Sequence, residues 1–437
     1  MNILVIGTGY VGLVSGTCFS EFGFQVTCID KDEAKIARLK KGEIPIYEPG
    51  LDDLVRRNLE AGRLCFDTDT ERHVGQADVI FIAVGTPTRR GDGHADLTYV
   101  FAAAEEVAAH LSGYSVIVTK STVPVGTGRQ LQDVIAKANP QADFDIASNP
   151  EFLREGSAIN DFMRPDRVVV GTESDRAITI MRQLYRPLYL IETPILFASL
   201  ETAELIKYAA NAFLATKISF INQIADLCEA VGANVHEVAK GMGLDKRIGG
   251  KFLHAGPGYG GSCFPKDTLA LVKTAEMHNI DMPMVEGVVH YNDQRKIAMA
   301  TRIKNAMGGD IQGKKIAILG LAFKPETDDM RDSPALSILP QLVADGAQIT
   351  AYDPAAMEEA KPLLPAAITY VKSSLDTLHE ADAVVVITEW NEFRAISASV
   401  FTDLMAGRIM VDLRNLYEAA QMTEAGLEYH SIGRSSL

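Results

Sequence analysis

Three reactive side chains follow a glycine-rich turn in residues 256–267, which read Gly-Pro-Gly-Tyr-Gly-Gly-Ser-Cys-Phe-Pro-Lys-Asp. Four glycines and two prolines predict an irregular segment here, with no regular helix or strand across it. The segment ends with a thiol (Cys263), an ammonium (Lys266) and a carboxylate (Asp267), and a cation three residues after a cysteine can hold the sulfur partly as thiolate. The segment could therefore supply a nucleophile, unless Cys263 is a buried and inert thiol, as most free cysteines are.

A dinucleotide-binding turn is the second chemical signal, and it lies at the start of the chain. Residues 2–7 form a short apolar run that predicts a buried parallel strand, and Gly-Thr-Gly-Tyr-Val-Gly follows at 7–12, before an apolar helix to about residue 22. A second strand, predicted at 24–30, ends in Asp30. In this setting G-x-G-x-x-G permits a tight turn and brings a pyrophosphate to the helix N-terminus. Asp30 would bind the adenosine ribose and repel a 2′-phosphate, which favours NAD over NADP. The alternative is that the glycines only pack helix against strand.

Polar loops follow three further predicted strands. The strands are 77–84, 115–120 and 144–148, and the loops after them are 85–88, 121–124 and 149–156. The carboxyl ends of parallel strands meet at one sheet edge, where doubly wound sheets bind ligands. The loops therefore predict a cleft beside the nicotinamide, unless they are ordinary surface turns.

One long helix is predicted from about residue 199 to 231, because no strong helix breaker occurs there. Apolar residues recur near the helical period and spread around much of the helix, which predicts a spine buried on several sides, between domains and between subunits. Lys207 and Asn211 are four residues apart and share a face. A lysine in such a helix is costly unless it has a partner or a task, or reaches solvent.

The second half of the chain echoes the first. Strands predicted at 315–320, 349–353 and 381–387 match those at 2–7, 24–30 and 77–84, but residues 320–323 lack the remaining glycines. This half should be a Rossmann-like domain that no longer binds a dinucleotide and could bind a nucleotide sugar. A last buried strand is predicted at 408–413, with Arg414 at its end. Lys324 and Arg331 could meet a diphosphate, or are solvated surface charges.

The predicted fold class is α/β, with two Rossmann-like doubly wound parallel-sheet domains joined by a long central helix. The predicted domains are an NAD-binding domain (1–198), a central helical region for dimerisation and catalysis (199–308) and a C-terminal Rossmann-like domain that binds a nucleotide sugar (309–437).

Composition narrows the partners and the location of this 437-residue chain. Its net charge of -15 argues against nucleic acid or an anionic membrane as a main partner. The five cysteines are scattered and never in C-x-x-C spacing, which indicates reducing cytosol and no metal site. Four of them lie in apolar patterns, and only Cys263 has a polar setting. No apolar run nears the ~20 residues of a membrane span, and Met1 runs straight into a strand, so a cytoplasmic protein without signal peptide is expected.

Seven segments, in this order, resemble the UDP-glucose 6-dehydrogenases, a branch of the UDP-glucose/GDP-mannose dehydrogenase family. They are Gly7–Gly12, Tyr47–Leu51, Ser121–Pro124, Asn149–Phe152, Lys207–Asn211, Gly258–Asp267 and Gly320–Lys324. The resemblance covers essentially the whole chain, and the cysteine segment is its most specific part.

The resemblance implies a four-electron oxidation, in which UDP-glucose, two NAD⁺ and water give UDP-glucuronate and two NADH. Cys263 would trap the aldehyde as a thiohemiacetal and then carry a thioester, a task that suits a nucleophile which is also a leaving group. Lys207 and Asn211 would stabilise oxyanions, and Glu151 would be the general base of the water steps. The match assigns Thr122 and Asp267 to holding the catalytic water and supporting the lysine. Lys207 is also a candidate base for the alcohol proton.

The resemblance further implies binding residues, dimerisation through the long helix and a role in supplying polysaccharide precursors. The implied cofactor contacts are Gly7, Gly9, Tyr10, Val11, Gly12, Asp30, Lys35, Thr86, Ser121, Thr122, Glu155, Lys266 and Arg331. The implied substrate contacts are Glu151, Phe152, Leu153, Arg154, Glu155, Lys207, Asn211, Arg247, Phe252, Leu253, His254, Ala255, Gly256, Tyr259, Gly260, Phe323, Lys324 and Arg414. In the family, the arginine at position 247 reaches the substrate of the neighbouring subunit.

Three alternatives stay open on the sequence. The chain could be a related dehydrogenase acting on GDP-mannose or a UDP-HexNAc. It could be a two-electron hydroxyacid dehydrogenase that uses Lys207 and Asn211 alone, which leaves Cys263 unexplained. It could also be an NAD-sensing or scaffold protein without turnover.

Overall fold

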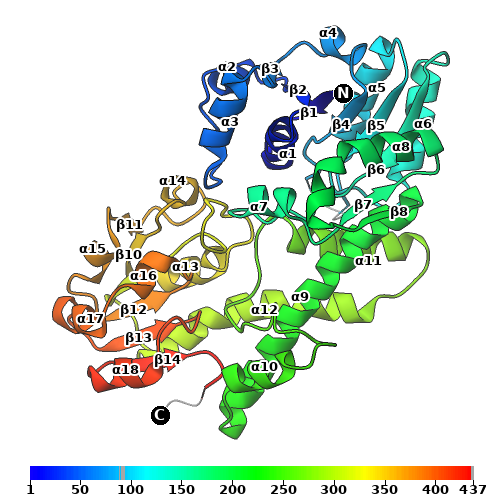
Figure 1. The fold of residues 1–437 in the computed structure, drawn as a ribbon. Coiled ribbons are helices and arrows are strands. Elements are labelled where there is room, and N and C mark those ends of the chain that lie inside the picture. The colour runs from blue at the N-terminus through cyan, green and yellow to red at the C-terminus, as the bar shows by residue number, and fades with distance from the viewer. Residues whose placement is uncertain (88, 90–93, 435–437) are drawn as a thin grey trace. The chain divides into compact units, whose positions relative to one another are not determined.

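Two largely parallel β-sheets organise the chain, and each belongs to one of two units (Figure 1). The computed structural model describes residues 1–87, 89 and 94–434, so Thr88 of the predicted loop 85–88 and residues 435–437 of the predicted domain 309–437 lie outside the described residues. The first unit comprises residues 1–210 and 273–280, and the second comprises 211–272 and 281–437. The predicted fold class, two Rossmann-like α/β domains with a long helix, is confirmed.

The sheet of the first unit has the strand order β3-β2-β1-β4-β5-β6-β7-β8. Strands β1 to β6 follow the 3-2-1-4-5-6 order of dinucleotide-binding sheets and pair in parallel. Strand β7 pairs antiparallel with β6, so the sheet is parallel apart from this one pair. The strands are β1 (Asn2–Ile6), β2 (Gln25–Ile29), β3 (Leu64–Asp67), β4 (Val79–Ile82), β5 (Ser115–Thr119), β6 (Phe144–Ser148), β7 (Val168–Gly171) and β8 (Ile195–Ala198).

Helices follow the strands of this unit in regular α/β alternation. They are α1 (Tyr10–Glu21), α2 (Glu33–Leu39), α3 (Leu51–Glu60), α4 (Thr70–Val74), α5 (Thr98–His110), α6 (Thr127–Ala138), α7 (Ala158–Met163), α8 (Asp175–Leu184) and the 3₁₀ helix η1 (Arg186–Ile191). Helix α9 (Leu200–Val231) contributes its first residues to this unit and the rest to the second.

The sheet of the second unit repeats the same order, as β11-β10-β9-β12-β13-β14. Its strands are β9 (Lys315–Leu319), β10 (Gln348–Tyr352), β11 (Thr369–Tyr370), β12 (Ala383–Val386), β13 (Ile409–Asp412) and β14 (Glu428–Ser431). The last buried strand predicted at 408–413 is β13, and one further strand, the partly exposed β14, follows it. Strand β14 was missed because it lies at the sheet edge and reads Glu-Tyr-His-Ser, without an apolar run.

The remaining helices of the chain are α10 (Val235–Gly243), α11 (Phe264–Met277), α12 (Pro283–Ala306), α13 (Ala335–Ala344), α14 (Met357–Ala360), α15 (Ser374–Leu378), α16 (Asn391–Arg394), α17 (Ala398–Leu404) and α18 (Ala419–Glu424). Helix α11 corrects the prediction of an irregular segment over 256–267, since Phe264 to Asp267 form its first turn. Pro265 is tolerated there because the first turn of a helix needs no backbone N–H donor.

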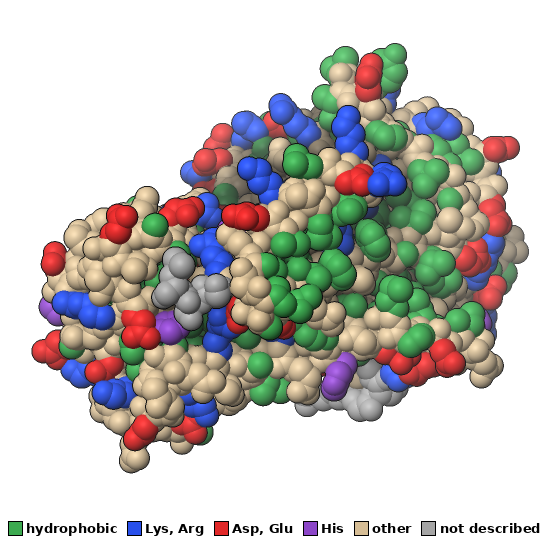
Figure 2. Space-filling view, turned by 90° about the horizontal axis from the view of Figure 1, so that it is seen from below, with side chains coloured by type: hydrophobic (Ala, Val, Ile, Leu, Met, Phe, Trp, Pro, Cys, Tyr) green, Lys and Arg blue, Asp and Glu red, His purple; other side chains and the backbone are tan. Residues whose placement is uncertain are grey.

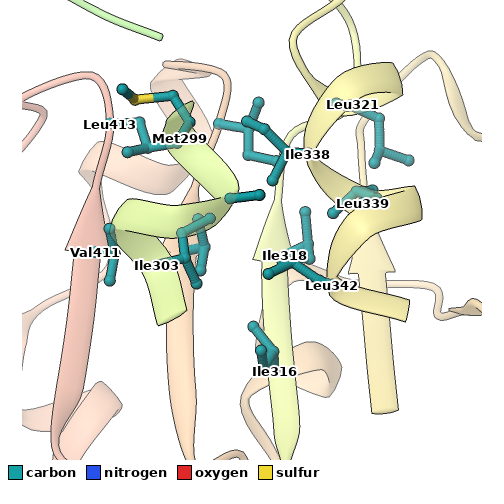
Figure 3. Packing of buried hydrophobic residues seen from close by; sticks show 14 of the residues in the cluster. Met299, Ile303, Ile316, Ile318, Leu321, Ile338, Leu339, Leu342, Val411 and Leu413 are labelled. Carbon is teal, nitrogen blue, oxygen red and sulfur yellow. The ribbon is translucent and has the colours of Figure 1, made fainter. Parts of the chain in front are cut away.

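Each sheet is buried under helices that carry apolar stripes. In the second unit, Ile303 of α12 lies beside Val411 of β13 and Met299 lies beside Leu413, as Figure 3 shows. Helix α13 lays Ile338, Leu339 and Leu342 over β9 in the same cluster. Burial of this kind is the main stabilising term of the unit, at about 25 cal/mol per Å² of apolar surface.

No helix within residues 1–87, 89 and 94–434 combines the length and the apolar character that crossing a membrane requires. The same residues contain no group of three or more histidine, cysteine, aspartate or glutamate side chains arranged to hold a metal ion.

Candidate active site

The three glycines of the predicted dinucleotide turn have different roles. Gly7 has a φ of +100°, and a Cβ there would lie 2.8 Å from the carbonyl oxygen of Ala83. A Cβ on Gly12 would lie 1.9 Å from the carbonyl oxygen of Gly7, so these two glycines allow helix and strand to pack. Nothing lies within 4 Å of a Cβ built on Gly9, and no side chain caps the helix that follows it. The turn therefore leaves an open helix N-terminus, which is where a pyrophosphate binds.

Asp30 lies at the end of β2 and is bound by its neighbours. Its Oδ2 accepts hydrogen bonds from Thr8 N (3.0 Å) and Thr8 Oγ1 (2.7 Å), and it pairs with Lys35 Nζ at 2.7 Å. Burial raises the pKa of this carboxyl, but the bonds from Lys35 and Thr8 outweigh burial and lower the pKa of Asp30 to about 2. Lys35 partly offsets the negative charge of Asp30, which weakens the predicted repulsion of a 2′-phosphate.

The loops after β4 and β5 are joined by hydrogen bonds. Thr86 Oγ1 donates to the carbonyl oxygen of Thr122 at 2.9 Å, and Ser121 Oγ donates to that of Val84 at 2.6 Å. The buried carboxylate of Glu204, on α9, accepts from Gly126 N (2.6 Å) at the start of α6. Three residues implied in cofactor binding thus lie together at one sheet edge, and Glu204 was not expected from the sequence.

Glu151 and Lys207 form a buried ion pair. Lys207 Nζ lies 2.9 Å from Glu151 Oε1, and the two side chains are only 4% and 5% exposed. Glu151 Oε2 also accepts from Leu153 N, and Lys207 Nζ lies 5.3 Å from the centre of the Phe152 ring. The alternative that Lys207 reaches solvent is therefore wrong. Asn211 follows it by one helical turn of α9.

Glu48 supports the loop that carries Glu151, a role that was not expected from the sequence. It is 4% exposed, and its Oε1 accepts from Ala158 N at 2.7 Å, at the start of α7. Its Oε2 accepts from Gly156 N at 2.7 Å and from the hydroxyl of Tyr10. Glu48 thus ties the dinucleotide turn to the loop after β6. The implied contacts Phe152, Leu153 and Glu155 are partly buried in that loop, whereas Arg154 is exposed and paired with Asp161.

Cys263 lies at the N-terminus of α11 and is half-buried. Its carbonyl oxygen accepts from Asp267 N at 2.8 Å, and its Sγ lies 3.6 Å from Ser262 Oγ. Lys266 Nζ pairs with Asp267 Oδ1 at 2.7 Å, while Asn211 Nδ2 donates to Asp267 Oδ2 at 2.6 Å. Asp267 therefore joins two implied site residues, and the charge of Lys266 is shared with it. The helix N-terminus is a second feature that favours a thiolate.

The turn before Cys263 is held by buried polar side chains that the sequence did not single out. Asn292 Oδ1 accepts from Tyr259 N (2.8 Å) and its Nδ2 donates to the Tyr259 carbonyl oxygen (3.0 Å). Gly256 N donates to Asn222 Oδ1 at 2.9 Å, and the Gly256 carbonyl oxygen accepts from Arg295 Nε at 2.6 Å. The implied contacts from Leu253 to Gly260 are buried in this turn apart from His254, and Phe252 precedes them with a φ of +64°.

Gly260 and Gly261 approach protein groups closely. A Cβ on Gly260 would lie 2.3 Å from the carbonyl oxygen of Asp332, and one on Gly261 would lie 2.7 Å from the Phe323 ring. Gly261 also has a φ of +83°, and its N–H donates to the Arg331 carbonyl oxygen at 2.8 Å. The protein itself therefore requires these glycines, whatever ligand binds nearby.

A buried aspartate holds the turn after β9, the first strand of the second unit's sheet. Asp353, at the end of β10, is fully buried, and its Oδ2 accepts from Leu321 N (2.7 Å), Ala322 N (3.0 Å) and Trp390 Nε1 (3.1 Å). Backbone N–H groups after the first strand would otherwise face a dinucleotide. Asp30 accepts from Thr8 N at the equivalent place of the first unit, so both turns are held by the aspartate that ends the second strand, and the absence of a dinucleotide from this half stays a prediction.

The basic side chains of the second unit that the resemblance implies in ligand binding differ in solvent exposure. Arg414 is largely buried and donates to the carbonyl oxygens of Ile387 (2.7 Å) and Phe323 (3.0 Å). Lys324 Nζ lies 5.2 Å from the centre of the Phe323 ring. The exposed bases Arg331 and Arg247 pair with Asp329 and Asp245, respectively.

Three domains of one protein family match the chain in order. The NAD-binding domain of the UDP-glucose/GDP-mannose dehydrogenase family matches residues 1–189, its central domain matches 201–294 and its UDP-binding domain matches 317–419.

Individual relatives match over the full length. A protein named UDP-glucose 6-dehydrogenase from Rhizobium meliloti is 58% identical over 99% of this chain and 100% of its own. UDP-glucose 6-dehydrogenase TuaD of Bacillus subtilis is 49% identical over 100% of this chain and 94% of its own. The structure of a UDP-glucose dehydrogenase from Pyrobaculum islandicum superposes with a TM-score of 0.91 at 37% identity, over 99% of this chain and 98% of its own. A UDP-D-ManNAc dehydrogenase structure from Pyrococcus horikoshii superposes with a TM-score of 0.86 at 26% identity, over all of both chains.

Proposed function

The chain belongs to the UDP-glucose/GDP-mannose dehydrogenase family, and on that premise we propose that it is an NAD-dependent UDP-glucose 6-dehydrogenase. The observation that carries the proposal is its full-length identity of 58% with a relative of that name. Identity with the UDP-D-ManNAc dehydrogenase structure is only 26%. The reaction would take UDP-glucose, two NAD⁺ and water to UDP-glucuronate and two NADH.

The first unit has the groups that NAD requires. Gly9 leaves the N-terminus of α1 open for the pyrophosphate, and Asp30 with Lys35 stands where the adenosine ribose would lie. Thr86, Ser121 and Thr122 lie together at the sheet edge. When bound, NAD⁺ accepts the hydride that leaves the sugar in each oxidation.

Cys263 is proposed as the nucleophile of the second oxidation. Its thiolate attacks the C6 aldehyde and forms a thiohemiacetal, whose C–H bond is again a hydride donor. Loss of that hydride leaves a thioester, and attack by water releases the carboxylate and the thiol. The half-buried setting at a helix N-terminus fits this chemistry, since it admits a sugar and favours the anionic sulfur.

The polar side chains of α9 and of the loop after β6 are proposed to stabilise oxyanions, accept protons and activate water. Lys207 and Asn211, one helical turn apart, would face the developing oxyanions. Lys207 would also take the alcohol proton, and Glu151, held against it at 2.9 Å, would activate the water. Asp267 would orient Asn211 and Lys266 through the hydrogen bonds it makes to both.

Replacement of Cys263 by serine tests the covalent mechanism. We expect wild-type protein to form two NADH per UDP-glucose, and the Cys263→Ser variant to lose at least about 10³-fold in that rate because serine is a weaker nucleophile and a poorer leaving group. Cys65→Ser is the matched control, because Cys65 is exposed on β3. Two NADH per sugar at the wild-type rate from Cys263→Ser would show that the reaction does not require the Cys263 thiolate, which contradicts the proposed mechanism.

A substrate panel separates this proposal from its rivals. We expect kcat/KM to be highest for UDP-glucose, and far lower for GDP-mannose and for UDP-HexNAc sugars. A higher value for either rival would replace the assigned substrate. One NADH per substrate with an aldehyde product would favour a two-electron dehydrogenase, and NAD binding without turnover would favour a sensor.

We also propose that the chain forms a homodimer through α9. Phe213, Phe220 and Leu227 recur every seven residues and are 66%, 45% and 56% exposed, so the helix that was expected to be buried on several sides carries an apolar stripe in a single chain. Hydrophobic side chains also gather on the face shown in Figure 2. Such patches mark interaction sites. In the dimer, the exposed Arg247 would reach the substrate of the partner, as in the family.

Light scattering on Phe220→Glu tests the dimer, which should dissociate to a monomer at micromolar concentration. A wild-type monomer would contradict the proposal.

We further propose a cytoplasmic location, supported by five free cysteines, and use of the product for polysaccharide synthesis. The three-part division at 198 and 308 likewise stays a proposal, supported by the three family domains that match in order.

A further inference from the structure

Lys120 is a buried lysine at the end of β5 that the reaction scheme above does not use. It is 4% exposed, and its Nζ donates to Asn149 Oδ1 at 3.0 Å and to the Tyr185 hydroxyl at 3.4 Å. The ring of Phe162 lies 5.8 Å away, centre to Nζ. No carboxylate of residues 1–87, 89 and 94–434 lies within 4.0 Å of this ammonium. An ammonium in such surroundings is costly unless another charge compensates it.

Two charged groups act on Lys120, and both belong to the proposed active site. Burial lowers the pKa of Lys120 to about 8, with the Glu151 carboxylate opposing that shift and the Lys207 ammonium adding to it. All three side chains are buried in the first unit. When every amine carries its proton, this cluster holds two cations and one anion, which leaves an excess positive charge in a site shielded from water.

The connection between Lys120 and Glu151 is short along the sheet. Strands β5 and β6 are parallel neighbours, and the Lys120–Asn149 bond joins the residues that directly follow them. Asn149 is fixed in turn, because its Nδ2 donates to the Val169 carbonyl oxygen at 2.7 Å and its Oδ1 accepts from Tyr185. Lys120 therefore stands at a defined place beside the loop that carries Glu151.

We propose that Lys120 is a positioning residue whose positive charge makes the Glu151–Lys207 pair a base for the C6 hydroxyl, an inference that rests on the proposed function. A lysine–carboxylate pair alone is neutral and holds its proton firmly. With Lys120 present, loss of one proton from the cluster removes an uncompensated buried charge. In the form that has lost the proton of Lys207 while Lys120 keeps its charge, the neutral Lys207 amine takes the hydroxyl proton: the O–H bond breaks, an N–H bond forms, and the hydride leaves C6 with its electron pair for the NAD⁺ that the reaction consumes.

Three variants of the full chain separate charge from structure, each measured as kcat against pH with saturating UDP-glucose and NAD⁺. Lys120→Met fills the apolar site without charge, so its acid limb should move up by about one pH unit, with about tenfold lower kcat at pH 7. Lys120→Arg keeps a permanent charge, and its acid limb should be no higher than that of wild type. Tyr185→Phe removes a hydrogen bond near Lys120 but no charge, and its acid limb should not move.

The thermal unfolding temperature is a second measurement, and it distinguishes a role of the Lys120 charge in the reaction from a purely structural role. Lys120→Met should unfold at or above the wild-type temperature, because a desolvated charge is replaced by an apolar side chain. An unshifted acid limb in Lys120→Met, or an equal shift in Tyr185→Phe or Lys120→Arg, would overturn the inference. If Lys120→Met does not fold, Lys120→Gln takes its place, because it also removes the charge but keeps a hydrogen-bond donor for Asn149, and the same two outcomes apply. Failure of the wild-type chain to oxidise UDP-glucose would refute the proposed function itself and is seen before any variant is compared.

Discussion

Replacing Glu48 with glutamine should loosen the loop that carries Glu151. The carboxylate accepts from Ala158 N and Ile159 N on one oxygen, and from Gly156 N and the Tyr10 hydroxyl on the other. A glutamine keeps one acceptor oxygen and places an NH₂ group in the position of the other. Because residue 48 is buried, with 4% exposure, the new NH₂ group would face one of the two pairs of donors that the carboxylate accepts from.

The free-energy cost of Glu48→Gln depends on how many buried donors lose their acceptor. A buried N–H without a partner costs about 1–3 kcal/mol. The Tyr10 hydroxyl can rotate and accept from the new amide, so Gly156 N is the group that suffers most, with a weaker bond left for it at 3.0 Å to that hydroxyl. Loss of the negative charge at the start of α7 adds about 0.3–1 kcal/mol. We therefore expect local opening of residues 152–163 to become about 1.3–4 kcal/mol easier.

Hydrogen exchange measures this opening directly, whereas a global unfolding curve of a two-unit chain does not give one free energy. Peptides spanning 152–163 should exchange roughly 8- to 700-fold faster in Glu48→Gln, since each 1.4 kcal/mol is a factor of ten. Tyr10→Phe is the control: it removes one donor and leaves the carboxylate with three backbone donors, so exchange should accelerate less in this variant than in Glu48→Gln. Exchange within threefold of wild type in Glu48→Gln, or an equal effect in both variants, would refute the reasoning.

Two other predictions concern strain and acid stability. Gly261→Ala should destabilise the second unit by about 2–4 kcal/mol, because its φ of +83° is strained for alanine and the new methyl meets the Phe323 ring at 2.7 Å. Gly249 has a φ of +69° with open space where a Cβ would lie, so Gly249→Ala should lower the stability of the second unit by only about 1 kcal/mol. Urea titration followed by the fluorescence of Trp390 measures both variants, and equal losses of stability would contradict the clash with Phe323. The lowered pKa of Asp30 adds stability above its unfolded value of 3.8 that is lost as the pH falls towards about 2. Asp30→Asn should therefore be less stable than wild type by up to about 2 kcal/mol at pH 6 and equally stable at pH 2, and a gap that persists at pH 2 would contradict that account.

Much of the fold could be predicted because its signals are local. Buried parallel strands are short apolar runs, and the glycine turn after β1 is recognisable from its spacing alone. Strand β14 escaped because an edge strand needs no apolar run, and the first turn of α11 escaped because a helix accepts proline at its start. Lys207 and Asn211 could be paired from sequence because a helix repeats about every four residues.

The partners of buried polar groups, by contrast, could not be predicted, because each lies far along the chain. Glu48 meets Gly156 across 108 residues, Glu151 meets Lys207 across 56, and Asn211 meets Asp267 across 56. Neither composition nor periodicity indicates such pairs.

The sequence by itself determined the two Rossmann-like halves, the dinucleotide turn and the identity of the reactive residues, since these depend on residue type and short spacing. Only the tertiary structure decided which charges are buried together. It showed that Lys207 is paired with Glu151 and that Lys266 shares its charge with Asp267. It also placed Lys120 in a site with no carboxylate within 4.0 Å among residues 1–87, 89 and 94–434. The physical reason is that the energy of a charge depends on its solvent exposure and on its neighbours in space, and only the folded chain sets both.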